Sequence, residues 1–138
     1  MSDAYTGGCA CGAVRYRIAG EPVFMNDCHC RDCQRRSGTG HGSYLTFPDR
    51  SRVRIDGQAA TWDIVADSGN VKTHAFCARC GSPVYLTFAA MPDLFTVHAA
   101  SLDEPERFQP QVVTYAVRRP SWDPANPVIP TFEKMPPM

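Results

Sequence analysis

The sequence predicts a mainly β fold with very little helix, built from short strands joined by many turns. The 138 residues include twelve prolines and ten glycines, which interrupt nearly every stretch and leave no room for a long amphipathic helix. Between these interruptions apolar and polar residues alternate, as they do in half-buried strands. At this length we expect one domain, residues 1–138.

The elements follow in order from these signals. The first predicted strand is 13–18, where Val14, Tyr16 and Ile18 alternate with two arginines. One helical turn is expected at 31–36, with Gly38 placed to end it. A Ser-Gly-Asn turn at 68–70 is expected to join two later strands. The remaining strands are predicted at 22–26, 43–47, 52–56, 61–66, 70–76, 82–88, 94–100 and 112–117.

The last part of the chain has a different composition. The final 34 residues hold eight of the twelve prolines. We therefore expect an extended, irregular C-terminal tail at about 118–138, wrapped on the surface or partly disordered.

Charge and hydropathy argue against several classes of partner. The 14 basic and 14 acidic residues cancel, which argues against nucleic acid and anionic membranes as partners. No apolar run approaches the roughly 18 residues that a membrane-spanning helix needs. The first residues have no basic region followed by an apolar one, so no signal peptide is predicted and a cytoplasmic location is expected. The oligomeric state leaves no signal in the sequence.

Seven cysteines are the unusual feature of the composition. An odd number cannot pair completely within one chain, so reduced thiols or metal sites are favoured over a disulfide framework. Cys9 with Cys11, and Cys77 with Cys80, form two separated pairs, each followed by a glycine that suits a tight zinc-binding turn. Together these four thiolates would make a closed, structural zinc site.

The other three cysteines, Cys28, Cys30 and Cys33, lie within six positions and would bind a second zinc. Three protein ligands leave one tetrahedral position open, as in catalytic zinc sites, and three thiolates favour a soft guest such as a thiol. Other interpretations stay open: buried thiols, a redox dithiol, or a site closed by a histidine. His41 is the better candidate for a fourth ligand or an acid–base group, although it also fits a solvent-facing loop; His29 should point away from the metal.

A family resemblance emerges when the motifs are taken together. They are Gly8–Gly12 (GCACG), Cys28–Gly38 (CHCRDCQRRSG), Phe76–Gly81 (FCARCG), Ser101–Asp103 (SLD) and Pro-Ser-Trp ending at Trp122. From about residue 5 to 133 the chain resembles the glutathione-dependent formaldehyde-activating enzyme family, also called the centromere protein V domain family. The resemblance implies small coiled antiparallel sheets with zinc knuckles, an exchange-factor-like zinc-binding β fold. It also implies two Zn²⁺ ions per chain, one structural and one catalytic at Cys28, Cys30 and Cys33.

The same resemblance implies a carbon–sulfur lyase-type activity that joins glutathione and formaldehyde into S-hydroxymethylglutathione. The expected partners are thus a small thiol and an aldehyde. A glutathione-like ligand carries two carboxylates, and Arg31 and Arg35 would share a helical face near the metal. Hydroxyl groups and a flexible loop could complete the site; a solvated basic turn is the plainer alternative. The predicted ligand contacts are Arg31, Arg35, Ser37, Gly38 and His41.

Two other functions remain compatible with the sequence. The chain could be a carrier that captures glutathione or another thiol without turnover. It could also be a zinc-ribbon module that binds another macromolecule, although the balanced charge disfavours nucleic acid.

Overall fold

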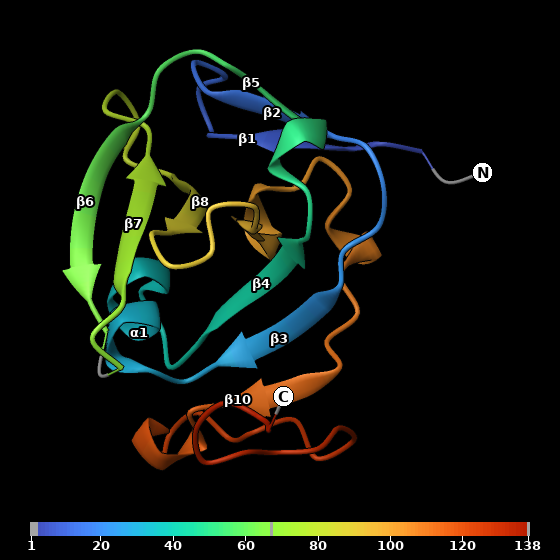
Figure 1. Ribbon diagram of the computed structural model, residues 1–138. Helices are drawn as coiled ribbons and strands as arrows, with labels where there is room; N and C mark the ends of the chain where they lie inside the picture. Colours follow the sequence, from blue (N-terminus) through green and yellow to red (C-terminus); the bar gives the residue numbers. More distant parts are fainter. Residues whose placement is uncertain (1–2, 67, 138) are drawn as a thin grey trace.

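The computed structural model describes residues 3–66 and 68–137, so residues 1, 2, 67 and 138 of the predicted domain lie outside the described residues. The chain forms two β-sheets, a small one and a large, strongly curved one (Figure 1). The prediction of a mainly β fold is confirmed. None of the helices in the described ranges has the length and apolarity needed to cross a bilayer.

The small sheet has three antiparallel strands in the order β1-β2-β5. Its strands are β1 (Tyr5–Gly8), β2 (Arg15–Ile18) and β5 (Val53–Asp56). The first of these was not predicted, because the Thr-Gly-Gly in Tyr5–Gly8 has no alternating pattern. Close packing explains the glycine at position 7, where a Cβ atom would lie 2.4 Å from the Tyr16 hydroxyl.

The large sheet has seven strands in the order β10-β3-β4-β9-β8-β7-β6. Every neighbouring pair is antiparallel except β10 with β3, which is parallel. Its strands are β3 (Phe24–Cys28), β4 (Gly42–Phe47), β6 (Ala60–Val65), β7 (Val71–Phe76), β8 (Pro83–Phe88), β9 (Phe95–His98) and β10 (Val112–Thr114).

One short α-helix, α1 (Arg31–Ser37), follows β3 as predicted. Cys30 is its N-cap, and Gly38 ends it in the left-handed conformation with φ of 78°. Single turns of 3-10 helix lie between strands at η1 (Arg50–Arg52), η2 (Ala99–Ser101), η3 (Pro105–Arg107) and η4 (Ala116–Arg118).

The two faces of the large sheet have different neighbours. One face packs on the small sheet and forms the main core, which includes Ile18, Leu45, Phe47 and Phe95. The other face carries a smaller cluster in which Tyr44 and Leu86 pack against cysteines of β3 and α1. Since side chains alternate along a strand, the face that is not used by the main core is available for a site.

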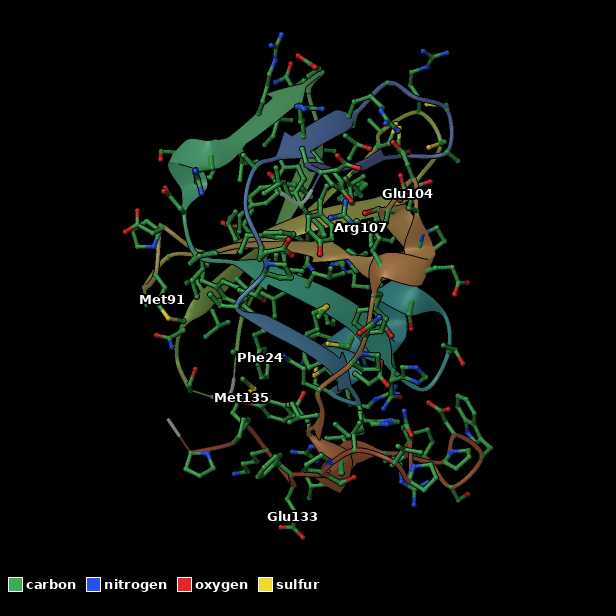
Figure 2. The ribbon with its side chains drawn as sticks, turned by 90° about the vertical axis from the view of Figure 1, so that its right-hand side faces the viewer. Phe24, Met91, Glu104, Arg107, Glu133 and Met135 are labelled. Atoms are coloured by element: carbon green, nitrogen blue, oxygen red, sulfur yellow. The ribbon has the colours of Figure 1, made fainter. Side chains whose placement is uncertain are left out.

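The first and last described segments are held to the rest of the protein by contacts over long distances in the sequence. Arg107, labelled in Figure 2, lies over the Tyr5 ring at 3.5 Å from its centroid and donates to the carbonyl of Ala4, which holds the N-terminal strand. The segment after residue 118 runs beside β10, where Phe132 N donates to Val113 O over 2.8 Å. Glu133 of this segment points outward at the bottom of the molecule in Figure 2.

Candidate metal centres and an adjoining basic cleft

The structure brings together the four cysteines predicted to form a closed site. Cys9 and Cys11 lie in the loop between β1 and β2, and Cys77 and Cys80 lie in the loop between β7 and β8. The Sγ atoms of Cys9 and Cys11 are 3.7 Å apart, and those of Cys11 and Cys77 are 3.6 Å apart. Tetrahedral zinc with bonds of about 2.3 Å requires sulfur separations of about 3.8 Å. The four thiols therefore fit a zinc ion with little adjustment.

The two loops of this group have the same backbone construction. Each has a glycine in the left-handed conformation directly after its second cysteine, Gly12 with φ of 82° and Gly81 with φ of 77°. Each also directs a backbone N–H at its first sulfur, from Val14 to Cys9 and from Arg79 to Cys77, both over 3.3 Å. Such N–H groups stabilise thiolates, so the loops are suited to charged ligands.

The three remaining cysteines also form a group, with all three Sγ atoms within 4.8 Å of one another. Cys28 ends β3, Cys30 caps α1 and Cys33 lies in its first turn. Among the histidine, cysteine and carboxylate side chains in the described part of the chain, none adds a fourth ligand to this group. The Sγ atoms of Cys30 and Cys33 are only 2.8 Å apart. A zinc ion would have to spread them by about 1 Å, so this group fits less closely than the first.

The contacts within this group favour the thiolate form at one of its three sulfurs, that of Cys30. Side-chain contacts with Cys28 and Cys33, together with the ammonium of Lys72, lower the pKa of the Cys30 thiol. Contacts with Cys28 and Cys30, together with burial, raise the pKa of the Cys33 thiol. Tyr44 packs beside these sulfurs, and its buried hydroxyl has no hydrogen-bond partner among the described atoms. The surroundings of the sulfurs thus combine apolar side chains with the Lys72 ammonium, which is paired with Asp32 at 3.5 Å, and the Tyr44 hydroxyl.

A cleft of about 300 Å³ lies between the end of α1 and strands β7 to β9. Its lining consists of Arg35, Arg36, His74, Ala75, Phe76, Gly81, Pro83 and His98. Burial lowers the pKa of His74 and of His98 to about 4, so both imidazoles are neutral near pH 7. Both ring nitrogens of His74 are buried without a partner among the described residues. His74 and His98 lie in predicted strands whose sequence pattern gives no sign of a cavity, and only the folded sheet places them here.

Only one of the residues predicted as ligand contacts lines the cleft, and the others have different roles in the structure. Arg35 lines the cleft. Arg31 instead donates to Gln34 on the same helix, and Ser37 donates to the Gln34 carbonyl. Gly38 serves as the helix C-cap. Arg36, which was not among the predicted contacts, lines the cleft and follows Cys33 by about one helical turn.

His41, the last of these predicted contacts, belongs to a third group with His29 and Asp123. Its Nδ1 lies 2.6 Å from Asp123 Oδ2, and His29 Nδ1 lies 2.9 Å from the Gly40 carbonyl oxygen. His29 thus bonds away from the cysteines, and the Asp123 carboxylate ties the C-terminal segment to the loop after α1. The sequence gave no signal for Asp123, since it lies 82 residues from His41.

The fold and these groups define a small β-sheet protein with two cysteine clusters compatible with zinc sites. The family model for "Glutathione-dependent formaldehyde-activating enzyme" matches residues 4–118. The chain belongs to this family, which confirms the resemblance seen in the sequence. The family name denotes activation of formaldehyde with glutathione.

Two individual proteins are similar to this chain at different levels. The chain is 26% identical over 121 residues to a Halomonas elongata protein named "Putative glutathione-dependent formaldehyde-activating enzyme", covering 84% of this chain and 77% of that protein. It also resembles the crystal structure of a Rhodobacter sphaeroides protein with a TM-score of 0.57 and 20% identity, over 92% of this chain and 99% of the other. The second likeness shows the fold alone.

Proposed function

We propose that this protein is a carbon–sulfur lyase-type enzyme that joins a glutathione-like thiol and formaldehyde, or a related aldehyde, into an S-hydroxymethyl adduct, reversibly. The proposal depends mainly on one observation: three cysteine side chains, and not four, converge on the face of the large sheet that lies away from the main core. A site with three protein ligands leaves room for a guest, whereas a four-ligand site is closed. Family membership supports the choice of thiol and aldehyde.

We propose two zinc ions per chain. Cys9, Cys11, Cys77 and Cys80 would hold a structural ion, and Cys28, Cys30 and Cys33 the catalytic one. The second ion would keep a guest thiol in its thiolate form at neutral pH, well below the free thiol pKa of about 8.5. Leu86 and Phe88 pack at this group and limit the access of water.

The reaction itself needs few protein groups. The thiolate electron pair forms a bond to the carbonyl carbon, the π pair of the C=O bond moves to oxygen, and that oxygen takes a proton from water. In the reverse direction the C–S bond breaks and the thiolate leaves. The protein's part is to hold the sulfur in place and to exclude competing water, which converts an encounter in solution into a reaction within one complex.

The test is an exchange measurement with ¹³C-labelled formaldehyde and glutathione at equilibrium, followed by NMR. Because the adduct also forms without a catalyst, the exchange rate and not the yield reports catalysis. We expect acceleration by the wild-type protein and none by Cys30→Ser. Tight calorimetric binding of glutathione without faster exchange would instead establish a thiol carrier and overturn the proposed activity.

A further inference from the structure

We propose that the cleft lined by Arg35, Arg36, His74 and His98 binds a carboxylate of the thiol guest, so that the protein selects anionic thiols over neutral ones. This inference depends on the proposed function, because it places the guest sulfur at Cys28, Cys30 and Cys33. It extends that proposal by assigning the cleft to the acidic end of the guest.

The cleft adjoins the three-cysteine group through three independent connections. Arg36 follows Cys33 by three residues on α1, which puts both side chains on one face of the helix. The Tyr44 ring, which packs on the cysteines, lies 5.0 Å from the His98 ring. His74 is the cross-strand neighbour of Leu86, a residue in the same apolar cluster. Tyr44 and Leu86 therefore lie between the cysteines and the cleft, and a guest with sulfur at the cysteines would reach the cleft past these two side chains.

The chemistry of the lining selects an anion. Two guanidinium groups and no carboxylate appear among its eight residues. Neither Arg35 nor Arg36 has an ion-pair or hydrogen-bond partner among the described residues, so both remain available to a ligand. Guanidinium groups match carboxylates in shape as well as in charge.

His74 provides a second sign of a missing ligand. It is 3% exposed, and both of its ring nitrogens lack a partner among the described atoms. A buried polar group without a partner costs free energy, so such groups in native proteins commonly face a ligand or bound water. A neutral imidazole can donate one hydrogen bond to a carboxylate oxygen, which a phenyl ring of similar size cannot.

A bulge shapes the wall of this cleft. The register between β7 and β8 shifts at Ala75 and Phe76, both of which line the cleft. Bulges turn a strand and redirect its side chains, and they concentrate near binding sites. The volume of about 300 Å³ lies at the lower end of the range for small-molecule pockets, which is enough for the end of a tripeptide but not for a macromolecule.

The test compares three thiols on the zinc-loaded, full-length protein by isothermal titration calorimetry. Glutathione carries the carboxylates, glutathione diethyl ester has the same peptide and thiol with both carboxylates esterified and uncharged, and 2-mercaptoethanol reports on the sulfur site alone. We expect the wild type to prefer glutathione to its diester by about 10-fold or more, the size of one charge-assisted hydrogen bond.

The variants are Arg36→Gln and His74→Phe, with Arg31→Gln as the matched control from the same helix. Both cleft variants should lose most of the preference for glutathione while binding 2-mercaptoethanol as the wild type does, and Arg31→Gln should keep the preference. Thermal unfolding shows whether each variant folds; if His74→Phe does not, Arg35→Gln replaces it.

Two outcomes would overturn the inference, and they are distinguishable. If glutathione binds but its preference over the diester is unchanged in Arg36→Gln and Arg35→Gln, the cleft assignment is wrong, while thiol binding at the cysteines, which the proposed function needs, is retained. If no thiol, including 2-mercaptoethanol, binds to the wild-type protein, the proposed function fails and the inference with it.

Discussion

A serine substitution in each cysteine group tests the division into structural and catalytic sites. Cys77→Ser and Cys30→Ser make the same chemical change, sulfur to oxygen, in the four-cysteine and the three-cysteine group. We expect Cys77→Ser to prevent stable folding. We expect Cys30→Ser to lose one zinc ion and the activity while remaining folded.

The magnitude follows from what each group joins. The four-cysteine group links the β1–β2 loop of the small sheet to the β7–β8 loop of the large one, and its ligands Cys11 and Cys77 are 66 residues apart. Two of its sulfur separations are already close to those of a zinc site, so metal binding and folding would favour the same arrangement. Structural zinc contributes on the order of 10 kcal/mol, comparable with the whole stability of about 5–15 kcal/mol of a domain. Without this site the folded state is no longer favoured.

The three-cysteine group joins only β3 to the adjoining helix, so its loss should be local. Cys30 also caps α1 by accepting from the Cys33 N–H. Serine is one of the best N-cap residues, so Cys30→Ser preserves this contact. We therefore expect a loss of no more than about 2 kcal/mol, or a fall in melting temperature of at most about 8 °C.

The assay combines zinc content by plasma emission with thermal unfolding by circular dichroism. The expected zinc contents are two ions per chain for the wild type and one for Cys30→Ser. A Cys30→Ser protein that keeps both ions would refute the assignment of the three-cysteine group. A Cys77→Ser protein with the wild-type melting temperature would refute the structural role of the four-cysteine group.

Three further predictions concern stability. Because burial lowers the pKa of His98 to about 4, the unfolded chain binds a proton between pH 6.5 and 4 that the folded chain does not, and stability falls as pH drops through this window. Urea unfolding should show that the free energy of unfolding falls between pH 7.5 and pH 5 by about 2 kcal/mol less in His98→Gln than in the wild type. An equal fall in both proteins would contradict this. A Cβ atom at position 40 would lie 2.2 Å from Asp123 Oδ2, so Gly40→Ala should release the C-terminal segment to limited proteolysis, and an unchanged cleavage pattern would contradict this. The Tyr44 hydroxyl is buried without a partner among the described atoms, so Tyr44→Phe should leave the metal-free protein as stable or slightly more stable in urea, and a loss above about 1 kcal/mol would reveal a missed contact.

Local patterns in the sequence predicted most of the fold. Alternation located nine of the ten strands, and the cysteine cluster with its glycine located α1 and its end. Tyr5–Gly8 was missed because its strand depends on pairing with β2 and not on its own composition. Trp62, a residue of the apolar type expected in a core, is 62% exposed because β6 is the edge of its sheet. Pairing over long distances cannot be obtained from local periodicity.

The candidate site, like the fold, was predicted only where the signal lies within a short stretch of the sequence. The two cysteine groups followed from ligand spacing, and the structure assembles both. The cleft did not, because His74 and His98 join it through strand pairing with Leu86 and Tyr44, which only the folded sheet establishes. The metal roles of the cysteines, and a single domain over residues 1–138, stay predictions.

The position of each cysteine group in the fold explains why one protein would keep two such sites with different ligand numbers. A site that ties two sheets together gains from being closed, since any exchange of ligands would weaken the whole structure. The group at Cys28, Cys30 and Cys33 lies on the face of the large sheet away from the main core, so opening it to a guest disturbs only β3 and α1. A chain that used one site for both purposes would unfold in part whenever a thiol displaced a ligand. The separation onto opposite faces removes that conflict. It predicts that saturating glutathione leaves the metal ion of the four-cysteine group in place. In cobalt-substituted protein, glutathione should therefore change only the absorption spectrum of the cobalt bound at the three-cysteine group.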